Sequence, residues 1–362
     1  MDTTIDLTGI PVDTGAPVLV TGATGYVAGW IVKALLDAGV TVHAAVRDPA
    51  STARVGHLRR IADNAPGELR LFAADLLQEG SYDLAMQDCR VVLHTASPFI
   101  QRVEDPQRDL VDPALRGTRN VLASADRVGS VRRVVLTSSV AAIYTDASEV
   151  AGLPGQVLTE EVWNTTASLD YEPYNYSKTL AEREAWELAG DQDRWRLVVI
   201  NPALVVGPAL NPGPTSESFA IVKKMGDGTM RFGAPRLGIG AVDVRDVARA
   251  HLAAAYLPDA EGRHIVSAHD TDIFVMAQAL IPRFSATHPI PTSAVPRPLV
   301  WLAAPSLGLT RTYVARNVDH VWRADATKSR RALGMRYRPL QESMEDMFGQ
   351  VIAQGGSAGH RA

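Results

Sequence analysis

Strand-length apolar runs alternate with helical patterns through the first half of the chain, and this alternation constrains the fold more than any other feature. The predicted strands cover residues 17–21, 40–46, 69–74, 91–96, 131–139 and 196–202. The first predicted helix ends at Ala38, before Gly39. Further helices are predicted over 51–63, 108–129 and 174–190. Such alternation forms βαβ units, so the sequence predicts an α/β fold with a doubly wound parallel sheet.

Beyond Pro202 the pattern changes, because proline and glycine at 207–214, 226–240 and 282–308 interrupt shorter elements. This change indicates a smaller C-terminal lobe interleaved with returning pieces of the first. We therefore predict a polar extension over 1–15, a Rossmann domain over 16–205 with returning segments near 240–268, a second lobe mainly over 206–350 and a flexible tail over 351–362.

Composition excludes several classes of partner. The formal net charge is -4 and Lys and Arg are scattered, so nucleic acid is not expected as a partner. No apolar stretch reaches the roughly 20 residues that cross a bilayer, and 298–310 is expected to be a buried or interface segment. The single cysteine, Cys89, and the absence of a signal-peptide pattern favour a reducing, cytoplasmic setting.

Histidine and serine patterns exclude two kinds of catalysis. The nine histidines form no H-x-x-x-H or H-E-x-x-H array, so no metal is expected, and His94 is interpreted as a core residue. Ser139 lies in TSSVA, which lacks the G-x-S-x-G elbow of a nucleophilic hydrolase.

The glycine-rich stretch TGATGYVAG lies between the first predicted strand and its helix. Gly22 permits the tight turn, Gly25 lets the backbone approach a pyrophosphate, and the small Ala28 lets helix pack on strand. A tight turn without a ligand would give the same pattern. If a dinucleotide binds, helix N-terminal amides face its phosphates, and the contact residues are Thr21, Gly22, Thr24, Gly25, Tyr26 and Val27.

The end of the second strand bears on which dinucleotide binds. AVRDP places Arg47 at the strand tip, and Arg54 follows seven residues later. Arginine suits a 2′-phosphate because its planar fork makes bidentate, charge-assisted bonds, so NADP(H) is favoured. A solvated arginine beside Asp48 is the alternative, and Asp48 itself leaves room for NAD.

Two further strand ends lie at the same predicted edge. Asp75 could accept from an adenine amino group while Leu76 covers the ring, although Asp75 could instead be a helix N-cap. The fourth strand ends in small residues that would leave room for the central riboses of the cofactor: Thr95, Ala96 and Ser97.

Tyr174 and Lys178 are four residues apart in YNYSK, so on a helix they share one face. An ammonium beside a phenol lowers the pKa of the phenol, which becomes a usable general acid. Ser139, in the strand-end TSS, could donate to a carbonyl oxygen as negative charge grows on it. An amphipathic surface helix would also explain the Tyr-Lys spacing, and a capping role would also explain the serine. The catalytic interpretation is favoured because the glycine turn, the arginine at a strand tip, the strand-end serine and the Tyr-Lys helix follow one another in the order expected on one sheet.

Several motifs together resemble the extended short-chain dehydrogenases/reductases: TGATGYVAGWIVKALLDAGVTVHAAVRDP, DPALRGTRNVL, RRVVLTSS, YNYSKTLAE, INPALVVGP and DVRDVARAHL. Within them the chain is most similar to the dihydroflavonol reductase, cinnamoyl-CoA reductase and aldehyde/ketone reductase group. The resemblance runs from about 17 to 347 and makes 16–205 an NADP-binding domain and 206–350 mainly a substrate-binding lobe.

The resemblance also implies roles for individual residues. It implies that Ser139 polarises the carbonyl, Tyr174 donates the proton and Lys178 binds ribose hydroxyls, with Ser138 a structural neighbour. Ser218 would reach the phosphates, although an ordinary polar loop explains TSES equally well. Four residues would pass the nicotinamide: Pro202, Ala203, Leu204 and Val205.

Two departures bear on the substrate. Tyr144 replaces the asparagine that dihydroflavonol reductases typically carry after the serine, and YNYSK lacks the cysteine of cinnamoyl-CoA reductases. A broader aldehyde or ketone reductase, monomeric or homodimeric and acting on a small carbonyl substrate, is therefore predicted. A sterol or nucleotide-sugar dehydrogenase/epimerase and a non-catalytic NADP-sensing protein are the alternatives. Aromatics that could wall an apolar pocket, or lie simply in the core, are Tyr144, Trp163, Phe99 and Phe219.

Overall fold

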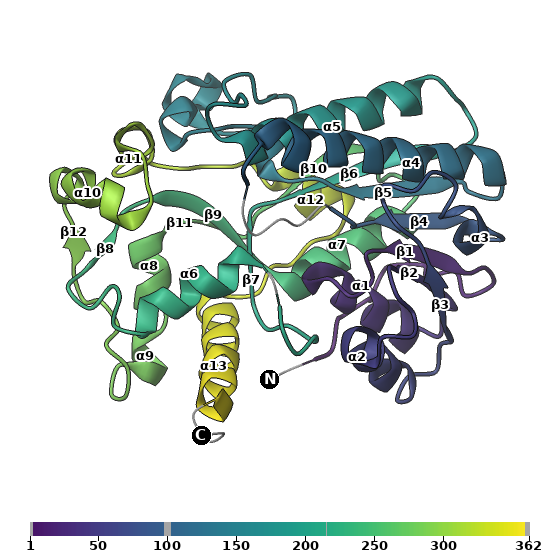
Figure 1. The fold of residues 1–362 in the computed structure, drawn as a ribbon, viewed down its shortest axis with the longest axis horizontal. Coiled ribbons are helices and arrows are strands. Elements are labelled where there is room, and N and C mark those ends of the chain that lie inside the picture. Colours follow the sequence, from purple (N-terminus) through teal and green to yellow (C-terminus); the bar gives the residue numbers. More distant parts are fainter. Residues whose placement is uncertain (1–2, 98–102, 215, 359–362) are drawn as a thin grey trace.

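A computed structural model describes residues 3–97, 103–214 and 216–358. Its centre is a seven-stranded parallel sheet in the order β10-β6-β5-β4-β1-β2-β3 (Figure 1). The strands are β1 (Val18–Thr21), β2 (Val42–Val46), β3 (Leu69–Ala73), β4 (Val91–His94), β5 (Arg133–Thr137), β6 (Arg196–Pro202) and β10 (Gly262–Val266). The predicted doubly wound sheet is confirmed, and its strand order reverses between β1 and β4, where such sheets bind ligands.

Helices cover both faces of this sheet, and β1, β2, β4, β5 and β6 send alternate side chains to the two cores. Val18 and Val20 of β1 pack under α1 (Tyr26–Asp37), α2 (Thr52–Ala62) and α7 (Val244–Tyr256). Leu19 packs under the helices of the opposite face: α3 (Asp83–Met86), α4 (Asp112–Val128) and α5 (Pro173–Gly190). This alternation is the two-residue period of a strand buried on both sides.

Two predicted helices differ in detail from the structure. α1 ends before Gly39, whose φ of 85° suits a left-handed C-terminus as expected. However, α1 is buried well beyond the predicted face: Trp30 and Leu36 are also buried, and α7 packs against this helix. The predicted helix over 108–129 begins with a π-helical turn (Gln107–Val111) and becomes α-helical only at Asp112.

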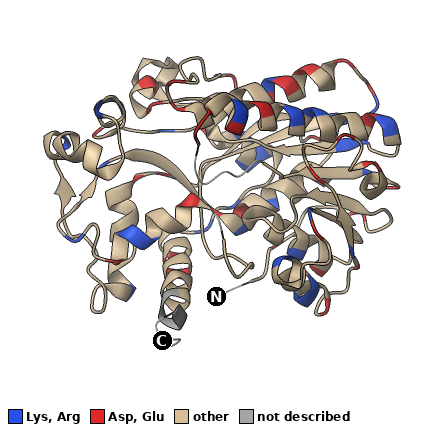
Figure 2. Ribbon diagram, viewed as in Figure 1, with Lys and Arg blue, Asp and Glu red and all other residues tan. Residues whose placement is uncertain are grey.

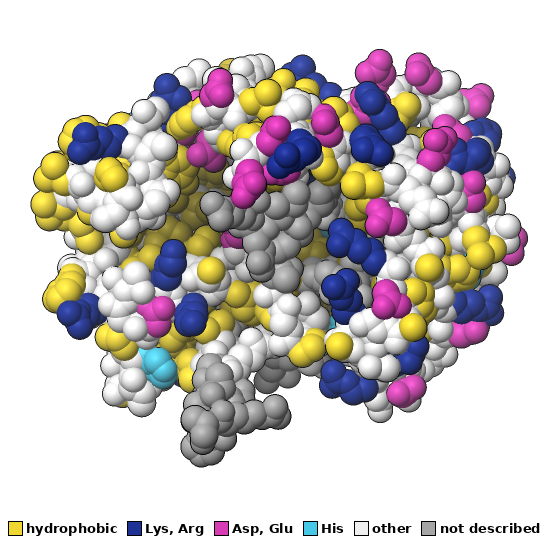
Figure 3. Space-filling view, in the orientation of Figure 1, with side chains coloured by type: hydrophobic (Ala, Val, Ile, Leu, Met, Phe, Trp, Pro, Cys, Tyr) yellow, Lys and Arg dark blue, Asp and Glu magenta, His cyan; other side chains and the backbone are white. Residues whose placement is uncertain are grey.

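The second lobe is built on a three-stranded sheet, β11-β9-β7, which comprises β7 (Leu204–Val206), β9 (Gly238–Asp243) and β11 (His269–Asp272). The helices α6 (Glu217–Gly226), α8 (Ile273–Gln278), α9 (Ile281–Phe284) and α13 (Leu340–Ala358) enclose a core with it. β6 passes into β7 through Ala203 alone, and β9 leads directly into α7. The two lobes are thus interleaved, and Figure 3 shows a hollow between them with hydrophobic side chains beside it.

The remaining elements form the outer end of the second lobe and a return to the first. A two-stranded sheet pairs β8 (Ala234–Pro235) with β12 (Ala294–Val295), beside α10 (Arg297–Ala303) and α11 (Arg311–Asn317), while α12 (Thr327–Ala332) lies against β10. Short helical turns lie at Val140–Ala142 (η2), Ala147–Gly152, Pro154–Gln156 and Ala304–Leu307. The 298–310 segment is not buried as a whole, because Leu299, Leu302 and Leu307 are 55 to 63% exposed.

The described residues near both ends of the chain are part of the folded structure. Residues 3–15 pack against the first lobe, where Ile10 is buried and Ile5, Leu7 and Val12 are partly buried. Residues 351–358, predicted as part of a flexible tail, continue α13. Among the described residues no helix combines the length and apolar character that a membrane span requires.

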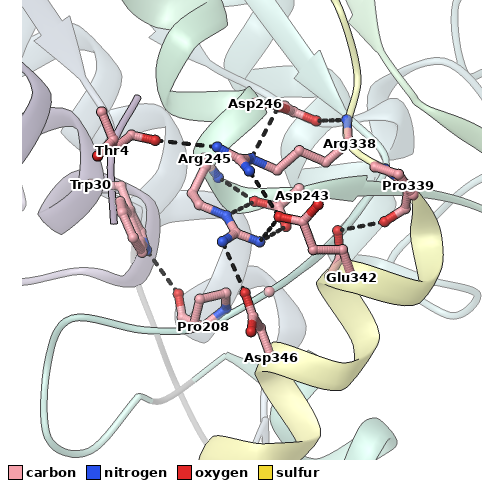
Figure 4. Close-up of polar contacts among 12 residues, drawn as sticks. Thr4, Trp30, Pro208, Asp243, Arg245, Asp246, Arg338, Pro339, Glu342 and Asp346 are labelled. Atoms are coloured by element: carbon pink, nitrogen blue, oxygen red, sulfur yellow. Dashed lines mark hydrogen bonds and ion pairs between the residues drawn. The ribbon is translucent and has the colours of Figure 1, made fainter. Parts of the chain in front are cut away.

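A buried ionic cluster fastens α13 to the first lobe (Figure 4). Arg245, 1% exposed, binds the carboxylate of Asp243 through its Nε and Nη2 atoms, each at 2.8 Å, and that of Asp346 at 2.9 Å. Asp246 accepts the Arg338 backbone N–H at 2.8 Å. On the outer helices α4 and α5, in contrast, acidic and basic side chains are interspersed (Figure 2).

Candidate active site

The glycine turn follows β1 and has the shape of an anion cradle. Gly22 has a φ of 61°, and a Cβ there would lie 2.9 Å from the Cα of Ala96. Gly25 caps α1 in an extended conformation, and no side chain occupies the N-terminal cap. Because the first amides of a helix lack intrahelical partners, they are free to bind phosphate. Ala28 is 2% exposed, so the third position is a packing position, as predicted.

Other predicted residues of this turn use their side chains for structure. The Thr21 hydroxyl is buried, accepts the Ala96 N–H at 3.1 Å and lies 2.9 Å from Nδ1 of His94. The Tyr26 hydroxyl donates to the carbonyl of Gly207 at 2.6 Å, and its ring meets Phe219 edge-on. Tyr26 therefore ties the turn to the second lobe, while Val27 packs on the first core and the Thr24 carbonyl accepts from Asn211 at 3.5 Å.

At the tip of β2 the Arg47 side chain is exposed, whereas the Asp48 carboxylate is held in a local turn. Arg47 and Arg54 are exposed, and neither forms an ion pair with another described residue. The Asp48 carboxylate accepts the Ala50 N–H at 2.9 Å and so closes a local turn. Arg54 belongs to the first turn of α2, where its own N–H donates to the carbonyl of Ser51.

Asp75 and Leu76 follow β3 in a turn. The Asp75 carboxylate accepts the Leu77 N–H at 2.8 Å, and no helix begins there, so the helix N-cap alternative is wrong. Leu76 packs closely on α4, because a Cβ added at Gly117 would overlap Cδ2 of Leu76. Leu76 also lines a small cavity of about 20 Å³ together with residues from β4 and α5, namely His94, Ala96, Ser97 and Lys178.

The tips of β1, β4 and α5 are joined by hydrogen bonds. The Thr95 hydroxyl donates to the Thr21 carbonyl at 2.6 Å. Lys178 Nζ donates to Ser97 Oγ at 3.1 Å and lies 5.8 Å from the centre of the Tyr174 ring. The structure therefore brings the predicted lysine to the predicted strand tip.

Tyr174 is the second residue of α5 and is 48% exposed. The helix starts after Glu172, which has a left-handed φ of 52°, and Pro173 then fixes the first helical φ. Ser139 follows β5, and its Oγ accepts the Ala141 N–H at 3.1 Å to cap η2, which packs against α5. The Ser139 hydroxyl hydrogen is left to donate to another group.

Two neighbours of these residues are structural, as expected. The Ser138 hydroxyl donates to the buried carboxylate of Glu182 at 2.5 Å. His94 is 2% exposed, and burial, aided by the charge of Lys178, lowers its pKa to about 3. The His94 imidazole is therefore neutral at physiological pH and belongs to the core.

The four residues predicted beside the nicotinamide form the junction between the sheets. Pro202 ends β6, the Ala203 N–H donates to the Val266 carbonyl at 3.1 Å, and Leu204 and Val205 begin β7. Ser218 lies in the first turn of α6, where it is 3% exposed and its Oγ accepts from Ser216 at 3.1 Å. Its hydroxyl is thus held within the second lobe.

The predicted aromatic wall is divided among different partners. Tyr144 lies 5.8 Å from Trp322, and burial raises the pKa of its hydroxyl. Trp163 lies under the guanidinium of Arg263 at 3.9 Å, and Phe219 packs on Tyr26. Phe99 lies outside the described residues.

Sequence reasoning missed three buried polar residues behind the serine and the helix: Glu182, Asn201 and Arg263. One signal was present, because Glu182 follows Lys178 by four residues and therefore extends the Tyr174 face of α5 by another turn. Asn201 and Arg263 lie on strands that are distant in sequence, and nothing local indicated that they meet.

Comparison with known proteins gives a consistent result. The model of the NAD dependent epimerase/dehydratase family matches residues 18–268. A cinnamoyl-CoA reductase from Medicago truncatula is 42% identical over 274 residues, which cover 74% of this chain and 82% of the relative. Tetraketide alpha-pyrone reductase 1 of Arabidopsis thaliana is 32% identical over 340 residues, 93% of this chain and 96% of the relative.

A similar solved structure is that of yeast methylglyoxal/isovaleraldehyde reductase Gre2 complexed with NADPH. It is 28% identical, covers 94% of this chain and 99% of its own, and superposes with a TM-score of 0.73.

Proposed function

This chain belongs to the NAD-dependent epimerase/dehydratase family of extended short-chain dehydrogenases/reductases, and we propose that it is an NADPH-dependent carbonyl reductase that converts an aldehyde or ketone to an alcohol. The observation that carries the proposal is that Lys178 lies 5.8 Å from the centre of the Tyr174 ring and donates to Ser97 at the β4 tip, while α5 packs against the η2 turn that Ser139 caps. This arrangement combines a proton donor with a cation that stabilises its conjugate base.

The residues around the glycine turn fit a dinucleotide. Gly22 and Gly25 and the first amides of α1 would hold the pyrophosphate, since side chains are absent where backbone must meet phosphate. Arg47, with no carboxylate partner among the described residues, would pair with a 2′-phosphate, whereas the Asp48 carboxylate is engaged in its own turn. These features support NADP(H) over NAD(H).

Each catalytic side chain would have a distinct task. NADPH, when bound, supplies the hydride that the carbonyl carbon accepts. The Ser139 hydroxyl donates to the carbonyl oxygen as negative charge develops there, and the Tyr174 hydroxyl gives up its proton to that oxygen. Lys178 stabilises the phenolate by its charge, and its hydrogen bond to Ser97 keeps the ammonium at the strand tip.

The names of the relatives support reduction rather than epimerisation. Proteins named as reductases of cinnamoyl-CoA, a tetraketide alpha-pyrone and methylglyoxal/isovaleraldehyde align with most of this chain. The retained Tyr174 and Lys178 pair argues against a binding protein without chemistry. We therefore expect a small carbonyl compound as substrate.

The direct test is a substrate screen at saturating NADPH. Aryl ketones, β-keto esters and short aldehydes are offered, and consumption of NADPH is followed together with formation of the alcohol. Turnover of at least one class is expected. If none is reduced while NADPH binds normally, the proposal of a carbonyl reductase is wrong.

A further inference from the structure

The Glu182 carboxylate is the centre of a buried polar network behind the proposed catalytic groups. Its side chain is fully buried, and it accepts four hydrogen bonds. Oε1 accepts from Arg263 Nε and Trp186 Nε1, and Oε2 accepts from Ser138 Oγ and Asn201 Nδ2. These donors come from β10, α5, the end of β5 and β6, so one carboxylate joins four elements.

The network reaches the proposed catalytic serine through Asn201. The Nδ2 group of Asn201 donates both to Glu182 at 2.7 Å and to the backbone carbonyl of Ser139 at 3.1 Å. Asn201 also directly precedes Pro202, where the predicted nicotinamide segment begins. The position of Ser139 is therefore coupled to β6 and to α5 by a single amide.

The same carboxylate lies in register with the proposed proton donor. Tyr174, Lys178 and Glu182 are spaced by four residues along α5 and share one face. Tyr174 is in the first turn and exposed, whereas Glu182 is held from below by four donors. Glu182 thus fixes the height and rotation of α5 against the strands.

Arg263 extends the network to the loop after the serine. Its Nη1 donates to the carbonyls of Glu160 and Val162 at 2.8 and 2.6 Å, and its guanidinium covers the Trp163 ring at 3.9 Å. Its Nη2 lies 3.5 Å from the carbonyl of Ala142, at the end of η2. The segment that begins with Ser139 is thereby held at both of its ends.

Stability alone is a weak reason to bury the ion pair between Glu182 and Arg263. Removing two charges from water is costly, and a buried ion pair often stabilises the fold no more than apolar residues of the same volume would. The four hydrogen bonds that converge on Glu182, and the two that the Asn201 amide donates, do, however, restrict these side chains to one geometry. Catalytic groups need such enforcement, because a displacement of about 1 Å can lower turnover about 100-fold.

We propose that Glu182, with Asn201 and Arg263, is a positioning residue that sets the separation between Ser139 and Tyr174. The proposal rests on the proposed function of these two residues. It does not make Glu182 a proton donor or a contact of the substrate.

The test compares Glu182→Gln and Asn201→Ala with Asp346→Asn, which removes one carboxylate partner of the buried Arg245 on α13 (Figure 4). With a carbonyl that the wild type reduces, both network variants should lower kcat about 10- to 100-fold. Their KM and NADPH Kd should stay within about twofold of wild type, and the midpoint of the kcat pH profile should shift. Asp346→Asn should lower Tm but leave kcat and the profile unchanged.

The proposal is overturned if the network variants lower Tm as Asp346→Asn does while kcat and the pH profile are unchanged. If Glu182→Gln does not fold, Asn201→Ala decides, because it removes one amide and no charge. If the wild type reduces no carbonyl, the proposed function fails separately. Crystal structures with NADPH then decide the positioning role: the Ser139 Oγ to Tyr174 Oη distance should change by about 0.5 Å or more in Asn201→Ala, and an unchanged distance refutes it.

Discussion

The ammonium nitrogen of Lys178 lies 5.8 Å from the centre of the Tyr174 ring, one helical turn away, and donates to Ser97 across the sheet edge. A helix face and a strand tip thus meet at one cation. This relationship makes the roles of the two α5 residues separable by experiment, because in the proposed mechanism Tyr174 gives its proton to the carbonyl oxygen, whereas Lys178 stabilises the phenolate by its charge.

Replacing Tyr174 by Phe should lower kcat by about 100- to 10,000-fold, the usual contribution of a positioned general acid. NADPH binding, measured by fluorescence titration, should stay within about twofold, because the ring and Lys178 remain. Tyr176→Phe is the matched control, two residues further along the same helix and on another face. Equal activity of Tyr174→Phe and wild type would remove Tyr174 from the mechanism.

Replacing Arg47 by Ala should weaken NADPH binding about 10- to 100-fold, the range expected for charge-assisted hydrogen bonds to a phosphate. NADH binding should change little, because NADH lacks the 2′-phosphate. Both Kd values are measured by titration, with Arg60→Ala as a control for charge on the neighbouring exposed helix face. If both cofactors weaken alike, Arg47 does not bind the 2′-phosphate.

The glycines of the turn should fail in different ways. Gly22→Ala places a Cβ at positive φ and 2.9 Å from backbone, so Tm should fall by several degrees. Gly25 has a φ of -71° and a Cβ there would lie 3.1 Å from the Gly22 carbonyl oxygen, so Gly25→Ala should fold with a smaller loss of Tm but raise the NADPH Kd more than about 10-fold. Gly29→Ala, whose Cβ would lie 3.9 Å from Leu210, should change neither property much. A Gly25 variant with normal NADPH affinity would contradict the pyrophosphate assignment.

Stability at mildly acidic pH should depend on His264. Burial lowers the pKa of this imidazole to about 4, below its unfolded value near 6.5. Between these pH values the unfolded chain binds a proton at this histidine that the folded chain does not. The free energy of unfolding therefore falls by about 1.4 kcal/mol for each unit that the pH decreases. His264→Leu should therefore flatten the fall in unfolding free energy between pH 6 and 5.

Denaturant unfolding at pH 8, 6 and 5 measures this effect. At pH 8 the imidazole is neutral in both states, so the variant should differ from the wild type only by a constant packing contribution. The same difference at all three pH values would show that His264 does not titrate on unfolding.

Much of the first lobe was accessible from the sequence because its determinants are local and periodic. Five of the six predicted strands are largely buried, the edge strand β3 being partly exposed, and Gly39 follows α1 in the expected conformation. The proximity of Tyr174 and Lys178 also followed from helical spacing. Their combination with Ser97 followed from parallel strands ending at one sheet edge.

What the sequence left undetermined depends on partners far along the chain. The sequence predicts Tyr26 as a cofactor contact, but it does not show that the Tyr26 hydroxyl donates to the carbonyl of Gly207, 181 residues away. Asp75 had two interpretations, and neither helical pattern nor composition could show that its carboxylate closes a turn on Leu77. Glu182 went unrecognised because only the fold brings Asn201 and Arg263 to it.

The Tyr26 hydroxyl bond to Gly207 has a consequence for protein engineering. The turn that would receive the cofactor and the lobe that would shape the substrate pocket share this residue, whose ring also packs on Phe219. A substitution at position 26 that alters the glycine turn would therefore also disturb the packing of the second lobe. The glycine turn and the second lobe can be altered independently of each other only while Tyr26 is kept.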